Sequence, residues 1–497
     1  MSLILFVAGN LAMAQVRDAA AFAGNIDTTE LRTHLYNLAS AEMEGRETAT
    51  DGQRKAAAYI EEYFRSKGLK AGANNTFQQR FPVYQDSTVK VSMRVNDVSL
   101  RSDSDFVVSN NTRFNIALSS STVVFAGYGI SDSTRNDYGN VNAKGKIVLV
   151  MPGSPPVMVK GKKRPGRIPD AYTLQQTAQN NGAAALLIID PRFPRNASPR
   201  KGPMYIREFT SDSLPVTFFI SDSAAMRILG ADYKSAVDLK KTGSPIPKEY
   251  SVQTTLEFQK NTQELESSNV IGILEGISKK DEAVIITAHY DHMGKKDSII
   301  FYGADDDGSG TVTILELADA FTKAAAAGAG PKRTVIFMTV SGEEKGLWGS
   351  EFYAANPVFP LAKTSANINI DMIGRVEARR KEDSLSYVYV VGDNRLSSDL
   401  RPISEAANKK LFNFTLDYKF NDPQDPQRIF YRSDHYNFAK NGVPAIFYFN
   451  GLHDDYHRPT DTPDKINYPL LAKRAQLIFH TAWEIANRDE MLKRDLE

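Results

Sequence analysis

Residues 283–292 read AVIITAHYDH, an apolar and largely β-branched run that turns polar at its last residues. Runs of the same kind recur through the C-terminal half of the chain, at 269–276, 334–344, 366–374, 387–393 and 444–451. Helical patterns alternate with these runs or follow them, at 310–327, 398–411 and 470–488. Near-continuous apolar strands that alternate with helices indicate a mostly parallel sheet. The sequence therefore predicts an α/β fold, a doubly wound, mostly parallel sheet with helices on both faces.

The remaining sequence has two different characters. Residues 28–70 carry apolar residues at the three- and four-residue spacing of helices. From about 85 to 250, short β-rich runs are separated by Gly, Pro, Ser and Asn. We therefore expect four segments, which are a signal segment at 1–14, the N-terminal part of the α/β domain at 15–88, a β-rich inserted domain at 89–255, and the core of the α/β domain at 256–497.

The composition excludes several classes of partner and chemistry. The 497 residues are 42% hydrophobic and 24% charged, with a net charge of +1. This near-neutral balance predicts no nucleic-acid partner and no attraction to an anionic membrane. Because the chain has no cysteine, disulfides, thiolate metal ligands and a cysteine nucleophile are all excluded.

The first residues, MSLILFVAGNLAMAQ, form a short apolar run that ends in Ala12-Met13-Ala14. This is an A-x-A-like site for signal peptidase. The usual basic start is missing, so either the true start lies upstream or the segment is not a signal. Fifteen residues are too few to span a bilayer, and no later stretch is long and apolar enough. We expect no stable membrane insertion and a periplasmic or secreted protein.

Polar clusters follow the apolar runs. They are His289-Tyr-Asp291-His292, Asp305-Asp306-Asp307, Ser341-Gly-Glu343-Glu344 and Asn369-Ile-Asp371, with His453, Tyr456 and His457 in a late loop. Singly, each has an ordinary explanation, since an Asp before Gly is usually a turn and a lone His is usually structural. Together they fall where parallel strands end, and the chemistry of such folds gathers at that edge.

Carboxylates that converge in one crevice must have their charge compensated. No Lys or Arg lies within the first three clusters, so we expect divalent cations to balance the acidic triplet. Imidazole and carboxylate ligands together suit zinc, and a bridging carboxylate holds two metal ions about 3.5–4 Å apart. The flanking Gly303, Gly308 and Gly310 allow the tight turn that such a bridge needs.

Five motifs in this order resemble the signatures of the co-catalytic zinc aminopeptidases, a group that also includes glutamate carboxypeptidase and glutaminyl cyclase. They are AHYDHMG, GADDDGSG, SGEEKGLWGSEFY, NIDMIGR and DYHRPTDTPDKI, and LASAEMEGRETAT near the N-terminus adds to them. The runs GKIVLVMPG and AAALLIID give the inserted segment a weaker resemblance to a protease-associated domain.

The resemblance implies two zinc ions and a role for each residue of the clusters. His289 and Asp371 would hold one ion, Glu344 and His457 the other, and Asp306 would bridge them through a segment whose Asp306–Asp307 bond is cis. Asp291 would orient His289. Glu343 would be the general base, and Tyr456 would stabilise the oxyanion.

The predicted function is that of an aminopeptidase, which hydrolyses peptides with a free N-terminus by metal-activated water. A carboxypeptidase or dipeptidase on the same scaffold is the alternative, and a non-catalytic, receptor-like binding module is a second one. The complete five-ligand set argues against a one-zinc cyclase. The chain has no His-Glu-x-x-His helix and no Gly-x-Ser-x-Gly elbow, which excludes the zincin and serine hydrolase sites built on them. Residues 430–445 are expected to line the substrate side, with His435 either there or structural.

Overall fold

The computed structural model describes residues 19–109, 112–133, 135–155, 157–159, 162–164, 166–195, 200–209, 214–242, 244–381 and 383–496. The expected signal segment, 1–14, lies outside these residues. The chain divides into two compact units, one of residues 1–82 with 266–497 and one of residues 83–265. The inserted domain expected at 89–255 lies within the second unit. None of the described helices is both long and apolar enough to cross a membrane.

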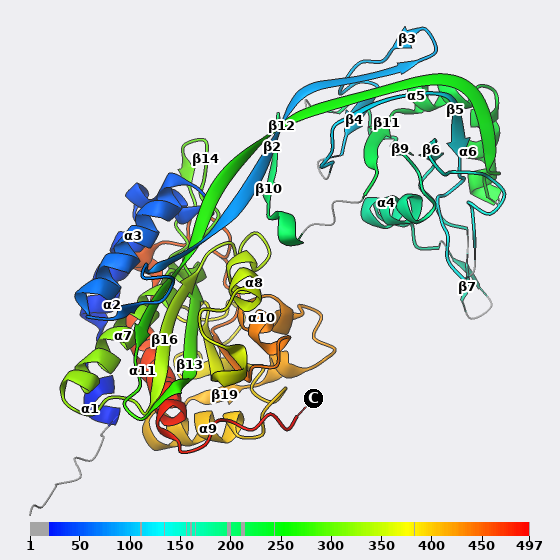
Figure 1. Ribbon diagram of the computed structural model, residues 1–497. Helices are drawn as coiled ribbons and strands as arrows, with labels where there is room; N and C mark the ends of the chain where they lie inside the picture. The colour runs from blue at the N-terminus through cyan, green and yellow to red at the C-terminus, as the bar shows by residue number, and fades with distance from the viewer. Residues whose placement is uncertain are drawn as a thin grey trace, which may run out of the picture. The chain divides into compact units, whose positions relative to one another are not determined.

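The first unit, which we call the α/β unit, is built on one sheet (Figure 1). Its strand order is β19-β18-β20-β17-β13-β16-β12. The central strands β20, β17, β13 and β16 are mutually parallel, while β12 and β18 run antiparallel to their neighbours β16 and β20. The strands are β13 (Lys279–His289), β16 (Arg333–Val340), β17 (Thr364–Ile370), β18 (Tyr387–Val391), β19 (Thr415–Asp417), β20 (Ala445–Phe449) and the end of β12 (Lys248–Leu274).

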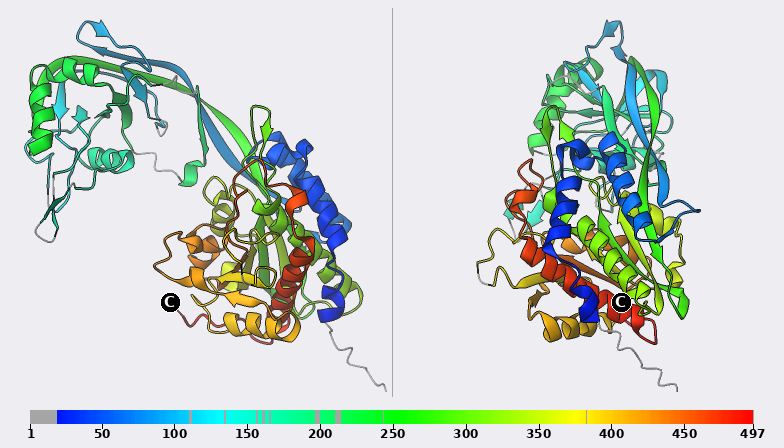
Figure 2. Two further views of the ribbon diagram at one scale, coloured as in Figure 1. Left: turned by 180° about the vertical axis from the view of Figure 1, so that it is seen from behind. Right: turned by 90° about the vertical axis from the view of Figure 1, so that its left-hand side faces the viewer.

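Helices cover both faces of this sheet. One face carries α2, α3, α7, α9 and α11, which share a buried apolar core with alternate residues of the strands. The right-hand view of Figure 2 shows α2, α3, α7 and α11 along that face. The opposite face packs on α8 and α10. The helices are α1 (Ala19–Ala23), α2 (Thr28–Leu38), α3 (Asp51–Ser66), α7 (Gly310–Ala326), α8 (Trp348–Ala355), α9 (Leu400–Leu411), α10 (His435–Ala439) and α11 (Tyr468–Asn487). The predicted α/β class, with a mostly parallel sheet covered on both faces, is confirmed.

The second unit has a further set of strands, which belong to the same hydrogen-bonded sheet through β12, and two apolar cores. Strands β5, β6, β9 and β11 are parallel neighbours in that order, with β12 and β4 antiparallel at the two sides. The elements are β4 (Phe106–Val108), β5 (Ile116–Phe125), β6 (Ile147–Val150), β9 (Ala185–Ile189), β11 (Val216–Ile220), α4 (Ala171–Asn180), α5 (Asp222–Leu229) and α6 (Asp232–Thr242).

Two long strands differ from the short runs that the sequence predicts between 85 and 250. They are β2 (Gln78–Val95) and β12, each of which supplies residues to both units. Polar and charged residues alternate with apolar ones along much of β12, so its 27 residues lack a continuous apolar signal. One part of β12 pairs with β5 and another part pairs with β16. These backbone hydrogen bonds hold its residues in one continuous strand.

Candidate metal centre

Most of the predicted site residues lie at the carboxyl ends of four adjacent parallel strands of the α/β unit or in the loops that follow them. His289 is the last residue of β13, and Glu343 and Glu344 come shortly after β16. Asp371 follows β17, and the loop after β20 carries His457. Thr287 of β13 pairs with Asn369 of β17, so that His289 and Asp371, each two residues further on, lie level with each other. Strand register therefore brings together residues from distant parts of the chain.

The three carboxylates of the acidic triplet point in different directions. Asp305 accepts a hydrogen bond from the Gly374 amide at 2.7 Å, and its other oxygen lies 3.2 Å from His453 Nε2. Asp307 accepts from the amides of Gly310, Met372 and His289 at 2.9, 3.0 and 3.2 Å. Backbone amides therefore hold Asp307 and one oxygen of Asp305, whereas, in the described part of the chain, the second Asp305 oxygen is buried beside His453 without a hydrogen-bond partner.

The middle carboxylate, Asp306, lies between two sets of possible ligands. Its Oδ1 is 3.3 Å from His289 Nε2, which is in turn 3.6 Å from Asp371 Oδ1. Its Oδ2 is 3.1 Å from His457 Nε2, which also lies 3.1 Å from Glu344 Oε2. The bond from Asp306 to Asp307 is cis. The five residues that the motif resemblance implies as zinc ligands thus lie together, with the other four around Asp306.

The structure adds His292 to the second set. Its Nδ1 lies 2.7 Å from Glu344 Oε1 and 3.8 Å from Asp306 Oδ2. His292, Asp306 and Glu344 form one group whose ligand atoms all lie within 4.8 Å of one another, and His289, Asp306 and Asp371 form another. The sequence places His292 in a polar cluster but does not distinguish it from a structural histidine, because only the fold turns its ring toward Glu344.

Unpartnered buried atoms make the site suitable for cations. Among the described residues, Asp306 Oδ2, Glu344 Oε1 and both ring nitrogens of His292 are buried and, despite these short distances, make no hydrogen bond of good geometry. Buried polar atoms are normally hydrogen-bonded, and exceptions call for an ion or a water molecule. A donor set of imidazole nitrogens and carboxylate oxygens suits zinc.

In the second ligand set, close contacts between imidazole and carboxylate groups shift the pKa values of both. Burial alone would lower the pKa of His457, but contacts with Asp306 and Glu344 raise it to about 10. Burial alone would raise the pKa of Asp306, but its close contacts with His289 and His457 hold it well below its usual range. The His457 imidazole therefore has a raised affinity for a proton at the atom where a metal ion would bind.

Hydrogen bonds fix the orientation of the first ligand set. Asp371 Oδ2 accepts from Ser433 Oγ at 2.7 Å, and Ser433 Oγ accepts from Asn369 Nδ2 at 2.7 Å. His289 Nδ1 lies 3.1 Å from the backbone oxygen of Asp291 and 3.8 Å from the nearer oxygen of its carboxylate. Asp291 is thus placed to orient His289, through its carbonyl group more closely than through its side chain.

Glu343 lies beside the ligands, with its Oε2 3.9 Å from His289 Nε2. Its backbone amide donates to Asp291 Oδ1 at 3.2 Å, while Thr48 donates to Asp291 Oδ2 at 2.7 Å. Burial raises the pKa of the Glu343 carboxyl group well above its usual range, and the charges of Asp371 and Glu344 raise it further. A carboxylate with a raised proton affinity is suited to general-base work.

A small cavity opens next to the ligands, and Tyr456 borders it. The ring of Tyr456 stacks on that of His457 at 3.8 Å between centroids, and Arg432 donates to its hydroxyl at 3.0 Å. The cavity is lined by His289, Asp306, Glu343, Asp371, Met372, Ile429, Arg432, Ser433, Phe447, Phe449, Leu452 and Tyr456. Of the segment 430–445, Arg432 and Ser433 therefore reach it. His435 does not line it, and is fully buried with its ring stacked on Phe447.

Arg46 is a residue that sequence reasoning missed. It is almost fully buried and donates to the carbonyl oxygens of Tyr290, Leu38, Tyr302 and Gly303 at 2.7 to 2.9 Å. These hydrogen bonds fix the position of the loop after β13 and of the residues just before the acidic triplet. The signal was its place in the N-terminal motif LASAEMEGRETAT, far from the other clusters in sequence.

Residues 269–482 match peptidase family M28. The chain is 26% identical over 257 residues to a probable zinc metalloprotease of Pyricularia oryzae, covering 44% of this chain and 50% of that protein. It is 29% identical over 214 residues to a probable leucine aminopeptidase of Trichophyton verrucosum, covering 42% and 55%. The chain therefore spans about half the length of the curated relatives it matches.

The fold has a solved counterpart in an aminopeptidase from Aneurinibacillus sp. strain AM-1. The TM-score is 0.57 at 19% sequence identity, over 96% of this chain and 98% of that one. The resemblance to co-catalytic zinc aminopeptidases, which rested on five motifs, thus agrees with both kinds of comparison. Over residues 269–482, the α/β unit of this chain is thus similar to peptidase family M28.

Proposed function

We propose that the chain is a dinuclear zinc aminopeptidase that hydrolyses the N-terminal residue from peptides. The observation that carries this proposal is the position of Asp306. One of its oxygens faces His289 at 3.3 Å and the other faces His457 at 3.1 Å. A buried carboxylate between two sets of mixed ligands is the arrangement that holds a pair of metal ions.

In the proposed reaction, zinc bound at this centre would lower the pKa of a water molecule to about 7. Glu343 accepts the proton of the attacking water and delivers it to the leaving amine. The Tyr456 hydroxyl, which accepts a hydrogen bond from Arg432, donates to the oxyanion as it forms. Asp291 and Ser433 keep His289 and Asp371 in position through the contacts described above.

The cavity walls suggest which N-terminal residues are accepted. Five of the lining side chains are apolar, namely Met372, Ile429, Phe447, Phe449 and Leu452. A charged side chain would lose its hydration there without gaining a partner. We therefore propose a preference for apolar N-terminal residues.

Carboxypeptidase activity is a second candidate, and Arg432 favours it. This exposed arginine lines the cavity, and a guanidinium group pairs well with the carboxylate at a peptide C-terminus. The two candidates differ in which end of the substrate must be free.

The test is a panel of one apolar peptide with its ends free, N-acetylated or C-amidated, assayed with zinc-loaded protein. An aminopeptidase cleaves the free and the C-amidated forms and spares the N-acetylated form. Cleavage of the N-acetylated form together with loss of cleavage on C-amidation would replace the proposal by the carboxypeptidase. A chain that neither binds zinc nor cleaves an aminoacyl-anilide would be a binding module instead.

The variant Asp306→Asn is the internal control for this panel. It removes the negative charge of the bridging group, so both zinc content and turnover should fall together. Full turnover by this variant would contradict a dinuclear mechanism.

A further inference from the structure

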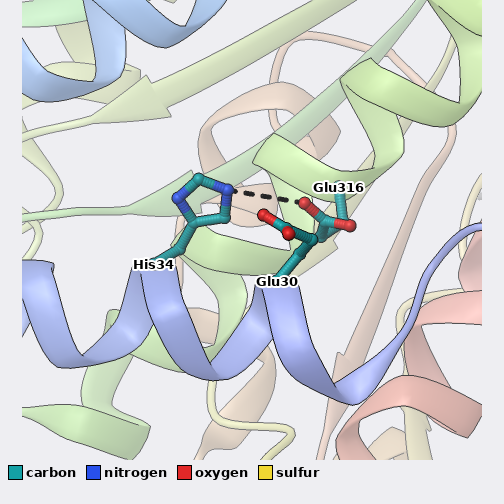
Figure 3. Close-up of side chains that lie close together, drawn as sticks. All are labelled: Glu30, His34 and Glu316. Carbon is teal, nitrogen blue, oxygen red and sulfur yellow. Dashed lines mark ion pairs between the residues drawn. The ribbon is translucent and has the colours of Figure 1, made fainter.

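A second group of metal-type ligands lies between helices α2 and α7 of the α/β unit, apart from the residues that face Asp306. It consists of Glu30 and His34 on α2 and Glu316 on α7 (Figure 3). Glu30 and His34 are four residues apart, which places them on one face of the helix. Figure 3 shows both side chains directed toward Glu316. One ligand atom from each of the three lies within 4.8 Å of the others.

The buried members of this group are poorly satisfied. Glu316 is 2% exposed and His34 is 5% exposed. His34 Nε2 is buried without a hydrogen-bond partner and lies 3.5 Å from Glu316 Oε1. That oxygen accepts one long hydrogen bond, at 3.3 Å, from the hydroxyl of Tyr63. The negative charge of a buried carboxylate needs stronger compensation than one neutral hydrogen-bond donor supplies.

Two lysines near this group pair with another carboxylate. Lys67 and Lys323 lie 2.7 and 2.6 Å from the two oxygens of Asp319. Burial raises the pKa of Tyr63, and the charge of Glu316 raises it further, which reflects the negative potential at this point. The group therefore combines an unpartnered imidazole nitrogen with two carboxylates.

The other nitrogen of the His34 ring is held as it is in metal-binding histidines. Nδ1 lies 2.6 Å from the hydroxyl of Tyr59, to which Asn37 also donates at 3.3 Å. When Nδ1–H donates to Tyr59, the Nε2 lone pair faces the two glutamates. Metal-ligating histidines typically donate their second ring N–H to an oxygen in this way, and the contact fixes the tautomer.

We propose that Glu30, His34 and Glu316 bind a third divalent cation, zinc, which ties α2 to α7. One imidazole nitrogen and two carboxylate oxygens suit zinc, and a water molecule completes a tetrahedral set. Because α7 begins directly after the acidic triplet, this ion would hold the helix that carries the metal-site loop. The proposal does not depend on the catalytic activity of the chain.

The first measurement is the zinc content of the full-length protein after equilibrium dialysis against free zinc. We expect three zinc ions per chain in the wild type and two in His34→Ala and in Glu316→Gln. Glu42→Gln, which changes an exposed glutamate of the same unit, is the matched control and should keep three. Two ions in both the wild type and His34→Ala would overturn the proposal and leave His34 and Glu316 as an ion pair.

Tyr59→Phe tests whether His34 binds the metal ion, because a purely structural role of His34 would leave zinc affinity unchanged in this variant. It removes the acceptor of Nδ1–H but no ligand, so calorimetric titration should show the third site weakened by about 10–100-fold. An unchanged affinity would contradict the assigned tautomer and the site with it. Because Glu30 is exposed, Glu30→Gln serves as the ligand variant should a buried substitution prevent folding, and an unchanged third site in it would equally overturn the proposal.

Thermal unfolding and activity separate this site from the catalytic one. The third equivalent of zinc should raise the melting temperature of the wild type but not that of His34→Ala. His34→Ala should retain hydrolysis of the aminoacyl-anilide. Loss of turnover in Asp306→Asn with the third site intact would show that the two proposals stand separately. A wild-type site that calcium saturates and zinc does not would overturn the imidazole ligation.

Discussion

At the scale of single residues, side chains that are adjacent in sequence make different contacts. Asp305, Asp306 and Asp307 are adjacent, yet only Asp306 faces both ligand sets. Asp307 accepts three backbone amides instead, and this network connects the loop to β13 and β17. Glu343 and Glu344 divide in the same way, since Glu344 contacts His292 and His457 while Glu343 lies next to His289.

The adjacent pair Glu343 and Glu344 gives a matched test. Glu343→Gln should keep two catalytic zinc ions and lose about 10²–10⁴-fold in kcat, because it removes a general base but no ligand. Glu344→Gln should instead lose zinc from the second site. Both variants are measured by metal analysis and anilide hydrolysis. Turnover by Glu343→Gln at the wild-type rate would remove this residue from the chemistry.

Zinc binding should release protons because His457 is protonated in the metal-free protein. Its pKa is raised from 6.5 to about 10, so between these values the metal-free folded protein holds a proton that a zinc ligand must lose. At pH 8 we expect His457 to contribute about one released proton, and apparent zinc affinity to rise with pH through this window.

Calorimetric titrations in buffers of different ionisation enthalpy measure the proton count. His457→Ala should release about one proton fewer than the wild type at pH 8. His480→Gln, which changes a histidine of α11 outside the ligand sets, is the control. An identical proton count for His457→Ala and the wild type would show that this histidine does not bind the metal ion.

At the scale of elements, the loop that carries Asp306 is positioned by close packing at both of its ends. Gly303 has a positive φ of 55°, and a Cβ there would lie 2.3 Å from the Asp306 carbonyl oxygen. At the other end, Gly310 begins α7 against Asp307 and β17. Arg46 fastens the start of this loop from a distant part of the chain through the carbonyls of Tyr302 and Gly303.

Gly310→Ala should disturb this loop. A Cβ at 310 would lie 2.5 Å from both carboxylate oxygens of Asp307 and 2.5 Å from the Ile370 carbonyl oxygen. Overpacking of this kind costs about 1–3 kcal/mol in the free energy of unfolding, and displacement of Asp306 should weaken zinc binding. Urea denaturation and zinc titration check both effects.

The control for this variant is Gly24→Ala. The nearest atom to a Cβ at 24 is the Ala20 carbonyl oxygen at 3.4 Å, an ordinary contact. We expect its free energy of unfolding to stay within about 0.5 kcal/mol of the wild type. A Gly310→Ala protein as stable as Gly24→Ala would show that the loop has room to relax.

At the scale of the whole molecule, the chain holds two sets of apolar cores. The core of the α/β unit joins α2, α3, α7 and α11 to the sheet, and the second unit has separate clusters around β5, β6, β9 and β11. Each unit thus buries apolar surface of its own, as a domain does. All predicted zinc ligands belong to the first unit.

Calorimetry should therefore show two unfolding transitions, and zinc should raise the midpoint temperature of only one of them. A ligand that binds the folded state stabilises it by about 2.7 kcal/mol at a hundredfold excess over Kd, and this applies only to the unit that binds. Asp306→Asn should reduce the shift of that transition and leave the other in place. A single transition whose midpoint temperature rises with zinc would show that β2 and β12 couple the two units into one cooperative structure.

The sequence by itself determined the α/β class, the strand and helix order of the α/β unit, and the residues that gather at the sheet edge. Apolar strands that end in His289, Glu343 and Asp371 are local patterns, and parallel strands bring their carboxyl ends together. Motif resemblance supplied the role proposed for each of these residues.

Tertiary structure alone decided which polar side chains face one another. The separate directions of the three triplet carboxylates, the place of His292 beside Glu344, the anchoring by Arg46 and the full length of β12 depend on contacts between residues up to 257 positions apart. The meeting of Glu30 and His34 with Glu316 has the same origin. A local pattern fixes the period of an element, whereas the partner of a buried side chain depends on how the elements pack.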